Sequence, residues 1–474
     1  MIERINNFYI LKFFNTNRRL HCLQILKIFL LIIFLGSKYD KISLRYKLKL
    51  NEIYFKLQLD LNFTFKNEIK NKIRIGIYYN SIKNGGIERL SALLLNYLDE
   101  VKIFKTYLFT HQQKEDNEYK IPTNTERIII NTEKKNHLIK MVDRHKIDIL
   151  IYHFYNEKEI QSLNRLKNTK IILYNHSCFL IWIYSQLYFF YKTIYNIYKN
   201  SKYVISLVPF ENDYLFKKWG INSILMTNFM TFNYNNVIPS DLSSQTILMI
   251  GRASDRMKRF ELGVEAMKHI IKEIPQSEMK IISNLNCVDY LEQLIKLLNL
   301  EDKIDLVGYY SNPEIYFKNA SLHIFPSISE SFGLVLSETK IFGIPNILVG
   351  LDYVSIVKGG TIIIYDDNSK SIAKEAIKIL KFYKYRKKLG KEARKSMKKF
   401  RNDLLLKKWI KLILSIYNGN YYYEKLKSQD NKITEEEAIN ILKNQVELLK
   451  MRMPRFKNIT IKNLENFEFM KGIS

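Results

Sequence analysis

The sequence predicts an α/β protein with two doubly wound parallel sheets in tandem. Two observations support this fold class. From Lys72 onward, short apolar runs alternate with polar loops and with stretches of helical periodicity, which is typical of successive βαβ units. A polar stretch, residues 228–246, interrupts this alternation, and the same rhythm then begins again. We interpret the polar stretch as the linker between two similar domains.

The first domain is expected over residues 72–230. It opens with a buried strand in KIRIGIYY and continues with a helix in IERLSALLLNYLD. This helix has apolar residues on one face, at the spacing of an amphipathic helix: Ile87, Leu90, Leu93, Leu94, Tyr97 and Leu98. Further strands are expected in the apolar runs KIFKTYLF, RIIIN, DILIYHF, TKIILY and KYVISLV.

The second domain is expected over residues 245–400, with no sequence repeat of the first. Its strands are expected in TILMIG, MKIIS, KIDLVG, SLHIFPS, NILV and TIIIY. Residues 401–420 predict a helix that ends this domain. Residues 421–474 form a tail in which Thr434 to Arg452 has the periodicity of a separate amphipathic helix.

Residues 1–71 form a basic N-terminal arm with one apolar segment, Ile25 to Gly36. This segment is shorter than the roughly 20 residues that a spanning helix needs. No small-residue cleavage site follows it, which argues against a signal peptide. Two interpretations stay open: a helix packed on the main body, or a membrane-associating segment inserted into one leaflet. The flanking Arg18, Arg19 and Lys38 favour the second, because cations are attracted to acidic headgroups.

The composition indicates a globular protein with anionic partners. Hydrophobic residues make up 47% of 474 residues, which excludes a disordered chain. Lys and Arg number 75 against 47 Asp and Glu, a formal net charge of +28, which attracts nucleic acid, acidic lipid or phosphorylated substrates without choosing among them. The three cysteines are scattered, which suggests a reducing compartment and no metal cluster.

Ligands of doubly wound domains bind beyond the carboxyl ends of the strands, so the residues that follow the strands are the candidates for a site. Gly85 and Gly86 separate the first strand from its helix, where a glycine turn and a helix N-terminus suit a phosphate. Arg252 and Lys258 follow the first strand of the second domain and could converge on a diphosphate. The structural alternative for Gly85 and Gly86 is a tight turn that binds nothing. For Arg252 and Lys258 the alternative is that they are solvated surface cations.

The stretch SESFGLVLSE, residues 329–338, follows the strand in SLHIFPS. The turn at Phe332 and Gly333 is expected to begin a helix whose N–H groups face a pyrophosphate. Glu330 and Glu338 are then roughly 10 Å apart, because a helix rises ~1.5 Å per residue. They are too far apart to share a proton, so we expect each to accept hydrogen bonds from hydroxyls of one extended ligand.

His176 follows the strand in TKIILY, at the expected ligand-binding edge. A lone histidine at such a place is often structural. The run from Tyr184 to Asn200 interleaves aromatic and basic residues and predicts an amphipathic helix. This helix could face lipid, pack into the core or stack on nucleic acid bases.

These motifs together resemble the family 4 retaining glycosyltransferases, which have the GT-B fold. That family has a Gly-Gly turn in the first domain, a Gly-Arg-Lys element after the first strand of the second, and a Pro-Ser pair. It also has an acidic pair separated by seven residues, followed by a Gly-x-Pro turn. The matching residues here are Gly85 and Gly86, Gly251, Arg252 and Lys258, Pro326 and Ser327, Glu330 and Glu338, and Gly343 and Pro345.

The resemblance covers residues 72–417, and the helix in KWIKLIL is similar to the terminal helix that crosses back to the first domain in this family. One departure is Arg259, where the family commonly has glycine after the lysine. The N-terminal arm and the tail beyond Asn418 match nothing in the family pattern.

The resemblance implies a nucleotide-sugar donor in the second domain and a glycan or lipid-linked acceptor in the first, across a cleft. Arg252 and Lys258 would neutralise the leaving diphosphate, and His176 and Glu330 would contact the donor sugar near the reacting carbon. Glu338 would bind the ribose. No metal and no cofactor are expected. The donor-binding set implied is Gly85, Gly86, Arg252, Lys258, Glu330, Phe332, Gly333, Leu334 and Glu338.

Two other classes of protein remain open. A sugar-nucleotide epimerase would share the fold and the nucleotide site but would need no acceptor groove. A non-catalytic basic protein that binds membrane or nucleic acid would share only the fold. We expect a cytoplasmic enzyme that is peripheral at the inner face of a membrane, with no nucleic acid partner.

Overall fold

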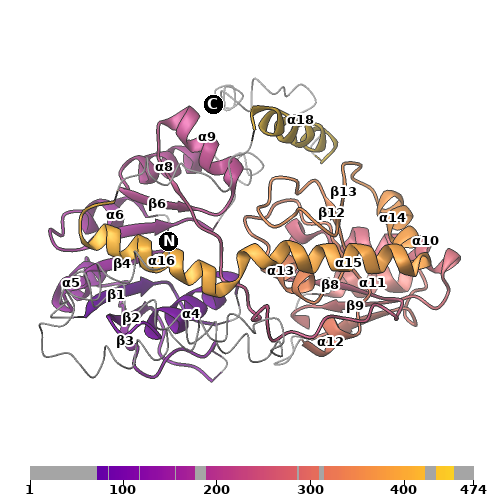
Figure 1. Cartoon of the computed structure of the whole chain (residues 1–474), viewed down its shortest axis with the longest axis horizontal. Helices are drawn as coiled ribbons and strands as arrows, with labels where there is room; N and C mark the ends of the chain where they lie inside the picture. The colour runs from indigo at the N-terminus through magenta and orange to yellow at the C-terminus, as the bar shows by residue number, and fades with distance from the viewer. Residues whose placement is uncertain are drawn as a thin grey trace, which may run out of the picture. The chain divides into compact units, whose positions relative to one another are not determined.

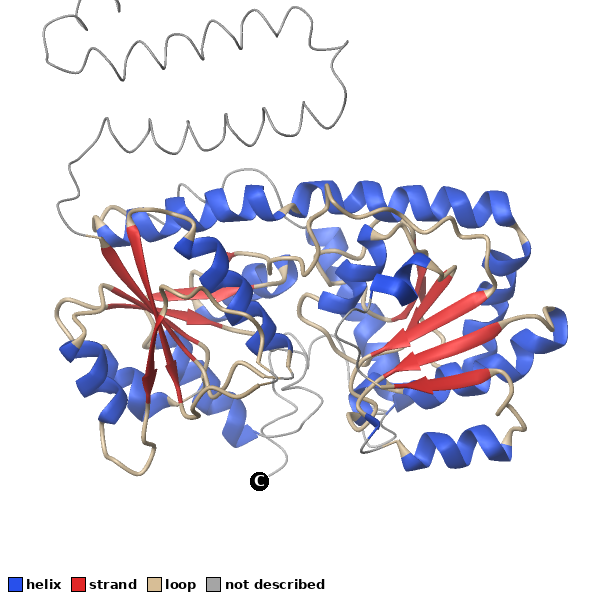
Figure 2. Ribbon diagram, turned by 90° about the horizontal axis from the view of Figure 1, so that it is seen from below, coloured by secondary structure: helices blue, strands red, loops and turns tan. Residues whose placement is uncertain are grey.

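The computed structural model describes residues 72–83, 85–116, 118–154, 156–176, 188–285, 288–308, 314–421 and 434–452. These residues form two doubly wound α/β domains, which confirms the predicted fold class (Figure 1). Each sheet has helices on both of its faces (Figure 2). The N-terminal arm with its apolar segment, residues 25–36, lies outside the described residues, as do all three cysteines.

The first domain has a seven-stranded parallel sheet with the order β3-β2-β1-β4-β5-β6-β7. All the strands expected from the apolar runs are confirmed. Only β7 was not predicted, because two residues are too short to show a pattern. The strands are β1 (Ile73–Tyr78), β2 (Phe104–Thr110), β3 (Glu126–Ile129), β4 (Ile149–Tyr152), β5 (Lys170–Tyr174), β6 (Tyr203–Ser206) and β7 (Ile224–Leu225).

The second domain has a six-stranded parallel sheet with the order β10-β9-β8-β11-β12-β13. Each of its strands was predicted. The central strands β8, β11 and β12 are buried on both faces, as their continuous apolar runs require in a parallel sheet covered by helices, whereas the edge strands β10 and β13 are partly exposed. The strands are β8 (Thr246–Ile250), β9 (Glu278–Ile282), β10 (Ile304–Val307), β11 (Leu322–Phe325), β12 (Asn346–Val349) and β13 (Thr361–Ile364).

Helices connect the strands and bury one apolar face each. In α4 the predicted face is confirmed at Leu90, Leu94 and Leu98, which are at most 1% exposed, whereas its other members are half-buried. The first-domain helices are α4 (Gly86–Asp99), α5 (His137–Arg144), α6 (Glu157–Leu163), α8 (Tyr188–Lys199) and α9 (Pro209–Trp219). The second-domain helices are α10 (Phe260–Glu273), α11 (Asp289–Leu297), α12 (Glu314–Lys318), α13 (Leu334–Ile341), α14 (Ser369–Lys381) and α15 (Tyr383–Met397).

Helix α16 (Asn402–Tyr417) follows α15 and packs on the first domain. Its first residue ties three segments together: the Asn402 side chain accepts a hydrogen bond from the Met230 N–H at 2.8 Å and donates to the Met230 carbonyl at 2.9 Å. It also donates to the Tyr97 hydroxyl on α4 at 2.7 Å. Trp409 of α16 is fully buried, with its ring 5.6 Å from that of Tyr174.

Helix α8 covers the described part of the aromatic and basic run, residues 184–200. Ile194, Ile197 and Tyr198 are at most 1% exposed, so this part of the run packs into the core. Of the three interpretations left open for this run, the described residues favour core packing. No helix in the described part of the chain is long and apolar enough to cross a membrane.

Candidate active site

Lys258 and Glu330 meet at the carboxyl ends of two neighbouring strands. Lys258 lies in the 3₁₀ turn η2 (Arg256–Lys258) after β8, and Glu330 lies in the loop after β11. The Lys258 ammonium forms an ion pair with the Glu330 carboxylate, and the Ser327 hydroxyl donates to the same carboxylate oxygen at 3.0 Å. The two charged side chains are 20% and 13% exposed, so they are largely shielded from water.

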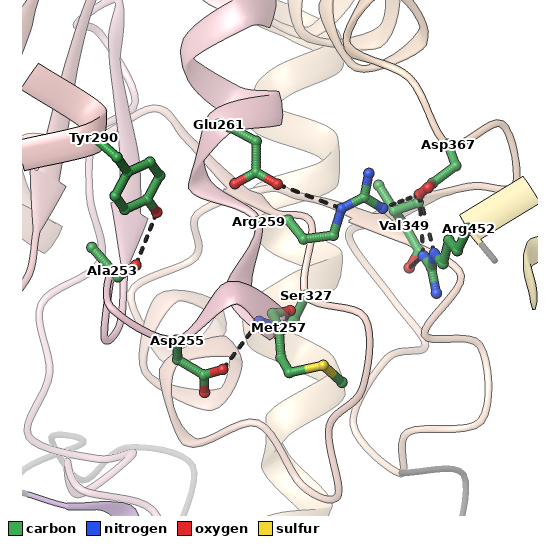
Figure 3. A network of polar contacts seen from close by, with 10 residues as sticks. All are labelled: Ala253, Asp255, Met257, Arg259, Glu261, Tyr290, Ser327, Val349, Asp367 and Arg452. Carbon is green, nitrogen blue, oxygen red and sulfur yellow. Dashed lines mark hydrogen bonds and ion pairs between the residues drawn. The ribbon is translucent and has the colours of Figure 1, made fainter. Parts of the chain in front are cut away.

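Backbone and side-chain hydrogen bonds fix the turn that carries Lys258 (Figure 3). The Asp255 carboxylate accepts from the Met257 N–H at 3.0 Å, and the Tyr290 hydroxyl donates to the Ala253 carbonyl at 2.8 Å. The Met257 carbonyl accepts from the Ile328 N–H at 2.8 Å. The loop after β8 and the loop after β11 are therefore joined directly beneath the Lys258–Glu330 pair.

The N-terminus of α13 lies beside this pair, as the turn at Phe332 and Gly333 predicts. Gly333 adopts a left-handed conformation, with φ of 75°, immediately before the helix. The first N–H groups of a helix have no partner within it, so those of α13 suit an anion. The Phe332 side chain is 1% exposed and lies near Phe400, so only the backbone of Phe332 is available to a ligand.

Glu338 is enclosed by protein groups. It is 3% exposed, and its Oε1 accepts hydrogen bonds from Arg89 of α4 at 2.7 Å and from the Thr231 hydroxyl at 2.6 Å. A ribose contact by Glu338 therefore uses Oε2 or displaces Arg89. Neither Arg89 nor Thr231 was identified from the sequence, because neither belongs to a local motif.

The N-terminus of α4 approaches the same region. A Cβ atom at Gly86 would lie 3.8 Å from Cδ1 of Leu334, the first residue of α13. A Cβ at Gly85 would lie 1.9 Å from the Glu88 carboxylate, so a larger residue at this position would displace the Glu88 side chain. Burial raises the pKa of Glu88, and the charge of the exposed Arg252 partly offsets the rise. Gly86 of the first domain thus lies close to α13 of the second, and Arg252 of the second domain acts on the charge of Glu88 in the first.

His176 lies in a separate cluster, next to His153 after β4. His153 Nδ1 and His176 Nε2 are 2.7 Å apart, and the two rings stack with 4.8 Å between centroids. Burial lowers the pKa of His153 to about 3, and burial together with His153 lowers the pKa of His176 well below its ordinary value. Both rings are therefore neutral, and His176 acts as a hydrogen-bonding group. No contact among the described residues joins His176 to Lys258 or Glu330.

A cavity of about 320 Å³ opens at the carboxyl ends of the first-domain strands. Aromatic and polar side chains line it together. His111 and Phe154 stack at 5.8 Å with an interplanar angle of 4°, and the Tyr78 hydroxyl lies 2.8 Å from His111 Nε2. The Glu159 carboxylate accepts from the Tyr152 hydroxyl at 2.7 Å, and burial raises its pKa. The sequence motifs gave no indication of this cavity.

Several curated proteins match part of this chain in sequence. A curated relative, an uncharacterized glycosyltransferase of Haemophilus influenzae, is 25% identical over 146 residues, which are 30% of this chain and 40% of the relative. The poly(glycerol-phosphate) alpha-glucosyltransferase of Bacillus subtilis is 27% identical over 157 residues, 32% of this chain and 23% of the relative. The chain thus spans less than half the length of these two relatives.

The solved structure of Anabaena HepE in complex with UDP and glucose has a similar fold. Its TM-score is 0.58 at 15% sequence identity, and the similarity covers 72% of this chain and 99% of HepE. The expected GT-B fold is confirmed. Residues 232–396 match the family model described as glycosyl transferases group 1. The similarity to group 1 glycosyl transferases therefore lies almost entirely in the second domain.

Proposed function

We propose that this protein is a retaining glycosyltransferase of family 4, which moves a sugar from a nucleotide-sugar donor to a glycan or lipid-linked acceptor of the cell envelope. One observation carries the proposal: Lys258 and Glu330 are paired at the strand ends, beside the free N-terminus of α13. A cation and a helix N-terminus suit a diphosphate. A carboxylate in the same place suits the hydroxyls of a sugar.

In this proposal Lys258 and Arg252 stabilise the negative charge that develops on the leaving diphosphate. The bond between the anomeric carbon and the phosphate oxygen breaks, and the acceptor hydroxyl forms a new bond to the same face of that carbon. The hydroxyl proton passes to the departing phosphate oxygen. His176, neutral in its pair with His153, would hydrogen-bond the donor sugar.

The retaining, front-face course is supported by the state of Glu330. Its carboxylate oxygen is engaged by Lys258 and Ser327, and a carboxylate held in this way is a poor nucleophile. The anomeric configuration of the product, read by NMR, tests this course. A product with inverted configuration would exclude it.

The first-domain cavity favours a transferase over a sugar-nucleotide epimerase, because only a transferase needs an acceptor site. The stacked rings of His111 and Phe154 and the carboxylate of Glu159 offer an apolar face and a hydroxyl acceptor, which suit a sugar. The name of the Bacillus relative, poly(glycerol-phosphate) alpha-glucosyltransferase, supports a polymeric envelope acceptor with an α-linked product.

A panel of radiolabelled nucleotide sugars, with UDP-glucose first, tests the function. We expect one donor to be hydrolysed slowly without acceptor, and transfer to appear with the matching acceptor. Replacing the exposed Thr132 at the cavity by tryptophan should raise the acceptor KM and leave donor hydrolysis unchanged. If no donor is hydrolysed and the protein binds nucleic acid, the non-catalytic alternative becomes the better explanation.

We expect transfer to persist in excess EDTA, because Arg252 and Lys258 supply the positive charge that a metal ion would otherwise bring. In the described part of the chain, no group of three or more His, Cys, Asp or Glu side chains could hold a metal ion. The measurement is the initial rate before and after chelation. Complete loss of activity that magnesium or manganese restores would contradict the metal-independent mechanism.

We also propose that the enzyme is peripheral at the cytoplasmic face of a membrane. The support is the apolar segment, residues 25–36, its flanking cations and the net charge of +28. The full-length protein should sediment with acidic vesicles and stay bound in high salt, because salt screens only the electrostatic part. An Ile32→Glu variant should bind at low salt and be released by high salt. If the full chain stays in the supernatant at low salt, a soluble acceptor is the better proposal.

A further inference from the structure

Side-chain hydrogen bonds at Thr434 define the N-terminus of the tail helix α18 (Glu435–Arg452). The Thr434 hydroxyl accepts from the Glu437 N–H at 3.1 Å, and the Glu437 carboxylate accepts from the Thr434 N–H at 3.0 Å. This reciprocal pair is a capping box. One face of the helix is buried, with Leu442, Val446 and Leu449 at most 6% exposed. Because one face of α18 is buried, this helix packs against another part of the protein.

That partner is the second domain. Leu448 is fully buried and belongs to the core of this domain. Gly350, directly after β12, makes room for it, since a Cβ atom at Gly350 would lie 2.0 Å from Leu448 Cδ1. The Gln445 side chain donates to the Gly350 carbonyl at 2.6 Å. The tail helix is therefore an integral layer of the second domain.

The C-terminal end of α18 reaches the Lys258 loop through a shared carboxylate. Arg452 donates to Asp367 Oδ1 from Nε at 3.3 Å and from Nη2 at 3.2 Å, and Arg259 forms an ion pair with the same oxygen (Figure 3). The side chains of Arg452, Asp367 and Arg259 are 4%, 8% and 14% exposed. Water is largely excluded from this triad, which strengthens its ion pairs.

Arg259 ends the turn that carries Lys258. It adopts a left-handed conformation with φ of 52°, which disfavours residues with a Cβ atom. The same backbone explains why the related family commonly has glycine at this position, and it makes Arg259 an unusual residue for this conformation. The ion pair with Asp367 holds the Arg259 side chain in place and so fixes the end of the turn next to Lys258.

The middle of α18 reaches the Glu330 loop through a second carboxylate. Asn444 and Gln445 donate to Asp352 at 2.9 Å and 3.2 Å. Tyr353, the next residue, is 3% exposed, and its hydroxyl accepts from the Glu330 N–H at 3.2 Å. Thus α18 is linked indirectly to both loops of the Lys258–Glu330 pair, through Asp367 and Arg259 to one and through Asp352 and Tyr353 to the other.

We propose that α18 is a positioning element of the donor site, which holds Lys258 through Asp367 and Arg259 and holds Glu330 through Asp352 and Tyr353. The consequence for donor binding rests on the proposed function, whereas the link between the tail helix and the two loops does not. Without α18, Asp367 would face solvent, where its ion pair with Arg259 would contribute little.

The test compares full-length wild type with Arg452→Met, which keeps an apolar stem but loses the charge. Hydrogen exchange is measured at the N–H groups of Lys258 and Ile328, both hydrogen-bonded in the wild type. We expect roughly tenfold faster exchange there, since hydrogen bonds to charged groups have about this effect. The dissociation constant for inorganic pyrophosphate should rise by a similar factor. The control is Lys450→Met, which removes the same charge from the same helix at a pair with Glu447.

A second variant, Asn444→Leu, removes the hydrogen bond from Asn444 of α18 to Asp352 and leaves the contact of Arg452 with Asp367 intact. It should accelerate exchange at the Glu330 N–H and leave that of Lys258 at the wild-type rate. This variant keeps the proposal testable if Arg452→Met does not fold. Unchanged exchange at all three N–H groups, or equal acceleration throughout the strands of the second domain, would overturn the proposal, because α18 would then only cover or stabilise the domain.

The two readouts separate this inference from the proposed function. Faster local exchange with weaker pyrophosphate binding supports both. Faster local exchange with no pyrophosphate binding in the wild type supports the positioning role of α18 and removes the diphosphate site from Lys258.

Discussion

Replacing Lys258 by methionine is expected to lower kcat for the donor identified by the panel by about 10²–10³-fold, the usual effect of losing one group that stabilises transition-state charge. Methionine keeps most of the length of the side chain and removes only its charge. The KM for the donor should change less than kcat, because the charge on the leaving diphosphate grows as the bond breaks. The measurement is steady-state transfer of the radiolabelled sugar.

A matched control is Lys296→Met, an exposed lysine on α11 of the same domain. It should retain wild-type kcat. Glu330→Gln and Arg252→Ala should also lose transfer without a change in the melting curve, since neither side chain belongs to the core. Wild-type kcat in Lys258→Met, with the protein folded, would show that the diphosphate binds elsewhere.

Replacing Lys340 by methionine is expected to lower the free energy of unfolding by about 3 kcal/mol, because buried carbonyls would lose their donor. Lys340 lies on α13 and is fully buried. Its Nζ lies within hydrogen-bonding distance of the carbonyl oxygens of Ile356 at 2.5 Å, Val357 at 3.1 Å and Lys358 at 3.0 Å. Urea unfolding measures the loss. The surface variant Lys280→Met, which breaks an exposed pair with Asp305, should change stability by less than about 0.5 kcal/mol.

We also expect the effect of Lys340→Met on the free energy of unfolding to depend on pH. Burial, and then the charge of Lys399, lowers the pKa of Lys340 from 10.5 to about 7. Above pH 10.5 the amine is neutral in both states. As the pH falls from 10.5 towards 7, the unfolded chain takes up a proton that the folded chain does not, so the contribution of Lys340 to stability declines. The difference in unfolding free energy between wild type and Lys340→Met should therefore increase with pH across this window. A constant difference would mean that the folded amine stays charged.

The alternation of strands and helices could be predicted from the sequence, because the apolar pattern of each element depends on which of its own faces are buried. A strand covered on both faces needs a continuous apolar run, and a helix needs an apolar stripe, so β1 or α4 can be recognised without knowledge of its neighbours. The sequence also placed Lys258 and Glu330 at the ligand-binding edge, although only the structure showed that β8 and β11 are neighbours. Both come directly after parallel strands of one sheet, whose carboxyl ends share an edge.

Other parts of the site depend on which distant side chains the fold brings together. Arg89 and Glu338 are 249 positions apart, and nothing near Arg89 marks it as the partner of a carboxylate on α13. The contact between His153 and His176 could not be predicted either, because it depends on the pairing of β4 with β5. The first-domain cavity likewise arises from loops that follow several strands.

Arg259 shows most clearly the difference between what is local to the sequence and what depends on the tertiary structure. The sequence alone determined that an arginine stands where the related family has glycine, and that an amphipathic helix follows the second domain. Only the tertiary structure showed that these features meet at Asp367, where Arg259 and Arg452 share one carboxylate. Periodicity is a local property of the chain, because it reflects which face of an element is buried. A shared ion pair is a property of three backbones placed together, and its strength comes from the water that their packing excludes.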